Sequence, residues 1–241
     1  MAIQKDQIKA LQQACKTDLR FLCKEVLGMT DWEELLHNDL AHQLDSPASR
    51  KLFLMPRGHL KSSIITVGWG LQQVLRDPNI RVLITNAVWD KARAFLNQIS
   101  GYLTDRSALP QIFGTFQTPN MRWTRDEIEI AQKTSRTIKE PTISTAGLEK
   151  SLTGYHYDLI ICDDLVDATN ITTAEQIEKV KSYYRNMLPL LDPGGRIVVI
   201  GTRWCIGDLY DELISTTATS INGHKIDSPA ERLDWRKWAP Q

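Results

Sequence analysis

The sequence has 241 residues, of which 42% are hydrophobic and 24% are charged, and its 29 basic side chains balance 29 acidic ones. This is ordinary soluble composition, with enough residues for one large domain. No apolar run approaches the about 18 residues of a membrane span, and the polar N-terminus lacks the apolar core of a secretory signal, so we expect no membrane association and a cytosolic protein. The zero net charge argues against a static grip on DNA, and any nucleic-acid contact must be a local patch.

The four cysteines are scattered along the chain, at Cys15, Cys23, Cys162 and Cys205. Zinc sites and disulfide frameworks both require closer or paired spacing than this. We therefore expect four buried free thiols.

Two amphipathic stretches open the chain. Residues 4–26 carry apolar side chains near helical spacing, and residues 32–44 follow as a second predicted helix with Asp31 as its N-cap. We assign residues 1–50 to an N-terminal helical segment or lid.

From Lys51 onward, short apolar runs alternate with helical patterns. Thr173 and Gln176 have the spacing of a capping box at the start of one long helix. Strands that are apolar throughout and alternate with helices predict an α/β fold with a mostly parallel sheet covered by helices on both faces. The predicted strands are 52–55, 81–85, 127–131, 142–145, 158–164 and 196–202; the predicted helices run to Arg76, to Tyr102, and over 173–190 and 207–215.

The segment PRGHLKSS, between the first predicted strand and its helix, contains the parts of a phosphate-binding loop in order. Such a loop needs a tight bend, inward N–H groups, a lysine, and then a serine or threonine at a helix N-terminus. Lys61 would reach the β- and γ-phosphates of ATP, and the Ser62 hydroxyl would be a ligand of Mg²⁺. The predicted ATP-binding residues are Pro56, Arg57, Gly58, His59, Leu60, Lys61, Ser62 and Ser63.

This loop departs from the usual pattern G-x-x-x-x-G-K-[ST]. Met55 and Leu60 occupy the two glycine positions, and only Lys61 and Ser62 fit. Gly58 can still provide the sharp bend. The alternative interpretation is a strand-to-helix turn that contains basic residues by chance.

A pair of acidic residues follows the apolar strand LIICDD. Phosphoryl transfer needs a carboxylate for Mg²⁺ at the C-terminal edge of a strand, beside a group that orients the attacking water. Asp163 would hold Mg²⁺ through water, and Asp164 would act as the base or position the water. The alternative is an acidic pair that caps the following turn.

A third strand, RIVVIGT, ends in Thr202 and leads directly into Arg203 and Trp204. Thr202 is placed either to sense the γ-phosphate or to cap the next turn, with Trp204 packed on the core. Because open α/β sheets bind ligands at the C-terminal edge of their strands, the three strand ends together favour a nucleotide site.

Three elements taken together resemble the terminase large subunits of tailed viruses: the variant loop PRGHLKSS, the strand LIICDD, and IGTRW followed by GDLYDEL. The resemblance covers roughly residues 30–215, which is the ATPase half of that family. It implies a P-loop NTPase fold of the RecA/ASCE type, preceded by the N-terminal helical segment, with ATP and Mg²⁺ as cofactors.

The resemblance also implies roles for individual residues. Arg57 is the basic residue of a variant Walker A loop and is a catalytic candidate together with Lys61 and Asp164. Asp163 is the Walker B aspartate, and Asp164 stands where the family usually has glutamate. Gly201 and Thr202 match the motif that couples nucleotide state to movement.

Further roles implied by the resemblance have several candidates each, and a plain surface role is the alternative for them. The candidates are Trp32, His37 and Gln43 for adenine, Arg122, Arg125 and Arg136 for an arginine finger that reaches a neighbouring subunit, and Lys91, Arg93 and Arg106 for DNA phosphates.

The function implied is that of an ATP-hydrolysing motor that moves double-stranded viral DNA into a procapsid. Expected partners are DNA, the portal protein, the small terminase subunit and four further copies in a homo-oligomeric ring, in the host cell cytoplasm. We expect no nuclease activity from this chain and interpret residues 216–241 as a linker. Alternatives are a catalytically weak or silent nucleotide-binding assembly module and another helicase-like remodelling ATPase.

Overall fold

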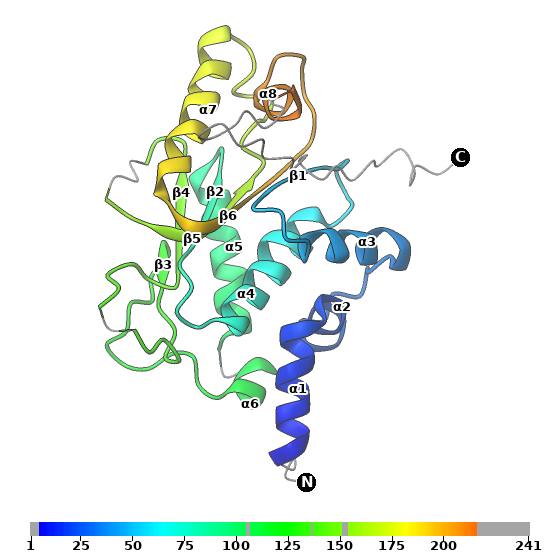
Figure 1. Cartoon of the computed structure of the whole chain (residues 1–241), viewed down its shortest axis with the longest axis vertical. Helices are drawn as coiled ribbons and strands as arrows, with labels where there is room; N and C mark the ends of the chain where they lie inside the picture. The colour runs from blue at the N-terminus through cyan, green and yellow to red at the C-terminus, as the bar shows by residue number, and fades with distance from the viewer. Residues whose placement is uncertain (1–4, 105–106, 136, 151–153, 216–241) are drawn as a thin grey trace.

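The structure is a computed structural model that describes residues 5–104, 107–135, 137–150 and 154–215 (Figure 1). Two of the arginine candidates, Arg106 and Arg136, and the predicted linker 216–241 lie outside the described residues.

The centre of the fold is a six-stranded sheet with the strand order β1-β6-β5-β2-β4-β3. All neighbouring strands are parallel except β3, which pairs antiparallel with β4 at the edge. The prediction of a mostly parallel sheet is therefore confirmed. The strands are β1 (Arg50–Leu54), β2 (Val82–Asn86), β3 (Glu127–Ile128), β4 (Ile143–Gly147), β5 (Tyr157–Asp163) and β6 (Leu191–Gly201).

Two predicted strands differ from the structure by more than two residues at one end. The predicted strand 127–131 is reduced to the two residues of β3, because the N–H groups of Glu129 and Ala131 donate to Arg122 and Phe116 instead of to β4. β6 begins at Leu191 instead of residue 196, because Leu191 pairs with Tyr157 before an irregularity in the β5–β6 register.

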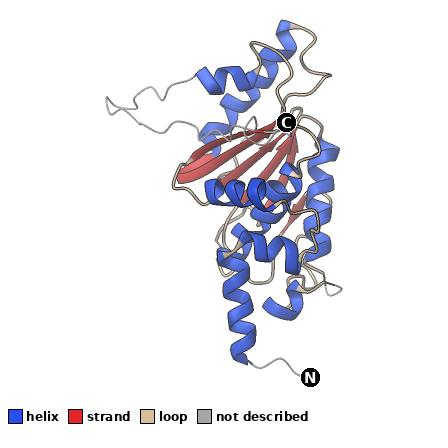
Figure 2. Cartoon of the chain, turned by 90° about the vertical axis from the view of Figure 1, so that its right-hand side faces the viewer, coloured by secondary structure: helices blue, strands red, loops and turns tan. Residues whose placement is uncertain are grey.

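Helices cover both faces of the sheet (Figure 2). Side chains of β5 alternate between two buried clusters: Ile161 packs with the N-terminal helices, and Ile160 and Cys162 pack on the opposite face with α7 and α8. An apolar run along the whole strand thus fills both cores, as expected for a doubly covered parallel sheet. The helical segments on the larger core are α1 (Lys5–Thr17), η1 (Leu22–Val26), α3 (Glu34–Leu44), η2 (Ser63–Trp69), α4 (Gly70–Arg76), α5 (Trp89–Tyr102) and α6 (Leu109–Phe113); those on the other are α7 (Ala174–Met187), η3 (Leu188–Leu190) and α8 (Leu209–Ser215).

The N-terminal segment differs from prediction in two details. The stretch 4–26 is not one helix, because the Asp18 side chain accepts a hydrogen bond from the Phe21 N–H and starts a new helical turn, α2 (Leu19–Phe21). The predicted N-cap Asp31 is also wrong. Glu33 caps α3, since its carboxylate accepts hydrogen bonds from the N–H groups of Leu35 and Leu36.

Other local predictions can be compared directly. The capping box of Thr173 and Gln176 is present at the start of α7. Three of the four free thiols are buried as expected, but Cys205 is only half-buried because it lies in the loop after β6. Among the described residues, no helix has the length and apolar character needed to cross a membrane.

The end of β6 is packed so tightly that position 201 has no room for a side chain. A Cβ atom at Gly201 would lie 2.1 Å from the Tyr210 hydroxyl oxygen and 2.2 Å from the ring carbon that carries it. Tyr210 is itself fully buried on α8. The glycine therefore brings the first turn of α8 against the end of β6.

Gly201→Ala should lower the free energy of unfolding by about 1–3 kcal/mol, because it overpacks a closed site. Thermal or urea unfolding measures this change. Gly101→Ala is the matched control, since its Cβ meets nothing within 4 Å on α5. The control should be neutral or stabilising by up to about 1 kcal/mol. Equal stability of the Gly201→Ala variant and wild type would contradict this packing.

Candidate active site

The strand order brings three loops together at one edge of the sheet. β6 lies between β1 and β5, and all three run parallel. Their C-terminal ends lead into the loop before Lys61, into Asp163–Asp164, and into Thr202. The three separate sequence signals therefore lie side by side.

The loop after β1 has two residues in the left-handed region of backbone space. Gly58 has φ +83° and Leu60 has φ +53°. Glycine adopts this conformation freely, whereas leucine does so at a cost of roughly 1–2 kcal/mol. The Leu60 side chain packs against the larger core, which offsets part of that cost. The predicted bend at Gly58 is confirmed, and Leu60 turns the chain where the usual motif has a second glycine.

Lys61 starts the helical conformation that continues into η2, and its residue is only 6% exposed. Its ammonium group donates a hydrogen bond to Thr202 Oγ1 at 2.8 Å and lies 3.8 Å from Asp164 Oδ1. Thr202 in turn donates to the Met55 carbonyl at 3.1 Å. Thr202, just after β6, thus bonds both to the loop lysine and to the backbone just after β1.

Asp163 is buried, with 1% of its surface exposed. Ser62 donates a hydrogen bond to its Oδ1 at 2.9 Å, and Thr66 donates to its Oδ2. Burial raises the pKa of this carboxyl from 3.8 to about 6, although both hydroxyl donors and nearby Lys61 favour the charged form. Asp163 and Ser62 are therefore adjacent, as the predicted shared metal role requires.

Asp164 follows the strand with φ +46°, a conformation that aspartate tolerates better than most residues. Its N–H donates to the Ile200 carbonyl at 2.9 Å, and its own carbonyl accepts from the Ala87 N–H at 3.3 Å. Within the described part of the chain, its Oδ1 is a buried atom without a hydrogen-bond partner, although the side chain as a whole is 35% exposed. This carboxylate is thus held at ion-pair distance from Lys61, with an oxygen that makes no hydrogen bond.

The donor set fits a nucleotide with a divalent cation. A buried carboxylate beside a serine hydroxyl suits Mg²⁺, which prefers oxygen ligands. The Cβ position of Gly58 is open, with nothing within 4 Å, and Asp164 keeps an unpartnered oxygen. The residues present therefore match the chemistry of a magnesium–nucleotide site.

Sequence reasoning missed two residues that hold Asp163 and a third, Tyr210, that contacts the segment just after the acidic pair. Thr66 donates to Asp163 from one helical turn beyond Ser62, and Asn86 donates to the Asp163 carbonyl at 2.7 Å from the end of β2. The buried Tyr210 hydroxyl accepts from the Val166 N–H at 3.4 Å. A polar residue one turn after the loop serine and an asparagine at a strand end were the available signals.

Arg57 lies at the exposed tip of the loop. Its guanidinium carbon is 4.7 Å from the centre of the Trp204 ring, an attractive cation–π arrangement. Trp204 packs partly on the smaller core, as its alternative interpretation had it. The loop after β1 and the segment after β6 are therefore in contact through these two side chains as well as through Lys61 and Thr202.

The adenine candidates lie on or beside α3. His37 is buried, and both of its ring nitrogens are within hydrogen-bond distance of backbone groups, the Glu33 N–H and the His59 carbonyl. The Trp32 indole N–H donates to Asn38, and Gln43 donates to Asp39. Of the three, His37 bonds to the phosphate loop, through the His59 carbonyl.

The described basic candidates lie close to acidic side chains. Arg122 pairs with Glu127, and Arg125 is 82% exposed and 3.9 Å from Asp90. Arg93 pairs with Asp90 and Asp126. Lys91 is exposed, 4.0 Å from Asp167. Arg93 is thus held by two carboxylates, whereas Lys91 and Arg125 have only distant partners.

Comparison with known proteins gives one curated relative in sequence. No family model matches the chain. The chain is 27% identical over 178 residues to the terminase large subunit of Enterobacteria phage T3, an alignment that covers 73% of this chain and 29% of that protein. The chain therefore corresponds to less than a third of that relative's length.

A solved structure shows the same fold. A variant of the large terminase ATPase domain of Thermus phage P74-26 matches with a TM-score of 0.51 and 15% identity over 89% of this chain and 88% of that one. The N-terminal domain of the DNA packaging ATPase of bacteriophage phi29 gives a TM-score of 0.43 and 11% identity, over 74% and 82% of the two chains. The chain is therefore similar in sequence to part of the phage T3 terminase large subunit, and its described residues have the fold of the Thermus phage ATPase domain.

Proposed function

We propose that this chain is the ATP-hydrolysing motor domain of a terminase large subunit. The observation that carries the proposal is the meeting of Lys61, the pair Asp163–Asp164 and Thr202 at the ends of three adjacent parallel strands. The sequence similarity to the phage T3 protein and the fold likeness support it.

In this proposal each residue of the site has a defined task. The N–H groups of residues 57–63 and the ammonium group of Lys61 would hold the β- and γ-phosphates. Ser62 and Asp163 would hold Mg²⁺, which when bound supplies further positive charge against the phosphates. Asp164 would orient the water that attacks the γ-phosphate in line, since its carboxylate lies beside Lys61 and its side chain is 35% exposed.

The contacts of Thr202 suggest how the site would be coupled to movement. Lys61 donates to Thr202, and Gly201 before it is packed against Tyr210 of α8. Phosphate oxygens would compete with Thr202 for the ammonium group of Lys61. The end of β6 and the first turn of α8 would then respond to the nucleotide.

The wider role is proposed from the similarity. The motor would drive double-stranded DNA into a procapsid in the host cell cytoplasm, working in a homo-oligomeric ring with the portal protein and the small terminase subunit. We assign residues 1–50 to a helical lid, 51–215 to the ATPase core and 216–241 to a linker. Of the two described finger candidates, Arg125 is the more exposed.

Lys61→Ala and Asp164→Ala should each reduce steady-state ATP turnover about 100-fold or more, since each removes a group that acts on the reacting phosphate. Turnover by wild type should be slow. Lys179→Ala is the matched control, because this exposed lysine of α7 pairs only with Glu149 among the contacts described. Phosphate release at saturating ATP measures the rates.

Equal rates in wild type, both site variants and the control would refute the site assignment. Tight ATP binding without turnover in wild type would favour a silent assembly module instead. The melting temperature of each variant shows that a lost rate is not lost folding.

Mg²⁺ binding in the presence of ADP should weaken as the pH falls below about 6, because Asp163 must be ionised to hold the cation and its pKa is raised to about 6. Protons and Mg²⁺ then compete for one carboxyl, and the apparent affinity should fall roughly tenfold for each pH unit below the pKa. Calorimetric titration with Mg²⁺ at pH 5, 6 and 7.5 measures this.

Asp163→Asn is the control for this titration, because nucleotide phosphates themselves ionise near pH 6. The variant should bind Mg²⁺ weakly and keep only the pH dependence of the nucleotide. The same pH dependence in wild type and variant would exclude Asp163 as the titrating ligand.

A further inference from the structure

The N-terminal helical segment touches the phosphate loop through one buried side chain. His37, on α3, is 2% exposed. Its Nδ1 accepts a hydrogen bond from the Glu33 N–H at 2.8 Å, so Nε2 carries the ring proton and donates it to the His59 carbonyl at 3.2 Å. Burial lowers the pKa of His37, which keeps the ring neutral at neutral pH, in this one tautomer.

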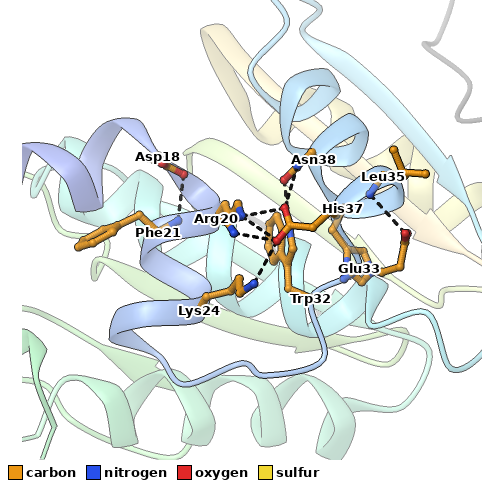
Figure 3. A network of polar contacts seen from close by, with 10 residues as sticks. Asp18, Arg20, Phe21, Lys24, Trp32, Glu33, Leu35, His37 and Asn38 are labelled. Carbon is orange, nitrogen blue, oxygen red and sulfur yellow. Dashed lines mark hydrogen bonds and ion pairs between the residues drawn. The ribbon is translucent and has the colours of Figure 1, made fainter.

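Several contacts fix the start of α3, from which His37 projects (Figure 3). Glu34 accepts a two-pronged set of hydrogen bonds from Arg20, at 2.8 and 2.7 Å, and further ones from Lys24 and Asn38, each at 3.1 Å. Asn38 also accepts from the Trp32 indole at 3.1 Å. The backbone at the start of α3, which carries His37, is therefore held in place by side chains of the preceding helical turns.

The carbonyl that His37 binds lies where the loop makes its sharpest turn. His59 stands between Gly58 and Leu60, the two residues with positive φ. Because the peptide bond is planar and trans, the His59 carbonyl and the Leu60 N–H point in opposite directions. Holding the carbonyl toward α3 therefore turns the Leu60 N–H toward the other side of the loop.

We propose that His37 is a positioning residue that fixes the His59–Leu60 peptide plane, so that the Leu60 N–H faces the nucleotide phosphate. This inference rests on the proposed function for its ligand. It gives a reason why the loop can work without its second glycine: a side chain from α3 supplies the peptide orientation that glycine would otherwise reach by its own freedom.

A matched pair of substitutions separates this role from simple packing. His37→Asn places an amide oxygen near the Nδ1 position, which keeps the bond from the Glu33 N–H and loses the bond to the loop. His37→Gln can place its amide nitrogen near Nε2 and donate to the His59 carbonyl. Asn38→Ala is the control, because it weakens the anchoring of α3 without touching the loop.

The first measurement is hydrogen–deuterium exchange of the loop amides, residues 57–62, without nucleotide. We expect exchange about tenfold faster in His37→Asn and within about threefold of wild type in His37→Gln and Asn38→Ala, since one buried hydrogen bond corresponds to roughly a factor of ten. The second is the Kd of ATP, which should rise about tenfold in His37→Asn only. Melting temperatures report any general loss of packing.

Unchanged loop exchange in His37→Asn would overturn the proposal, as would an equal loss of ATP affinity in the Asn38→Ala control. If wild type binds no ATP, the proposed function fails, while the exchange comparison still tests the His37 contact. If His37→Asn does not fold, the ¹⁵N shifts of the wild-type ring decide. A proton on Nε2 supports the proposal, and a proton on Nδ1 refutes it.

Discussion

The site depends on one constraint, the insertion of β6 between β1 and β5. Lys61 follows β1 and Asp163 ends β5, and these two strands do not pair with each other. β6 spaces them, and its terminal Thr202 takes the hydrogen bond from Lys61. The parallel ladder therefore sets the separation of the ammonium group and the carboxylates, and neither loop has to define that separation alone.

The C-terminal edge of the sheet also holds a buried carboxylate, Asp163, whose charged form is disfavoured by burial. Asp163 is buried and receives two hydroxyl hydrogen bonds, yet its pKa is still raised, because its lost hydration exceeds what those donors return. A divalent cation would reverse this balance. The strain at Leu60 and the unpartnered oxygen of Asp164 belong to the same pattern, in which local stability is given up where a ligand is proposed to bind.

Sequence alone could predict the individual strands, the strand-end residues and the capping of α7, because apolar runs and the polar residues at their ends are local signals. It could not predict that β6 lies between β1 and β5, since strand order depends on long-range pairing. Thr66 and Asn86 escaped notice for the same reason: each becomes part of the site only through a partner far along the chain. Asp31 was mistaken for a helix cap because Glu33, a residue less typical of that position, forms the bonds instead.

The backbone of Asp164 is clamped from both sides, by Ile200 of β6 and by Ala87 after β2. With the main chain fixed, the carboxylate can move only by rotation of its own two side-chain torsions. A glutamate would have a third torsion and more conformational entropy to lose on being ordered. The aspartate side chain thus reaches less far than glutamate but loses less entropy when it is ordered. Its carboxylate is positioned mainly by the backbone that the sheet holds in place.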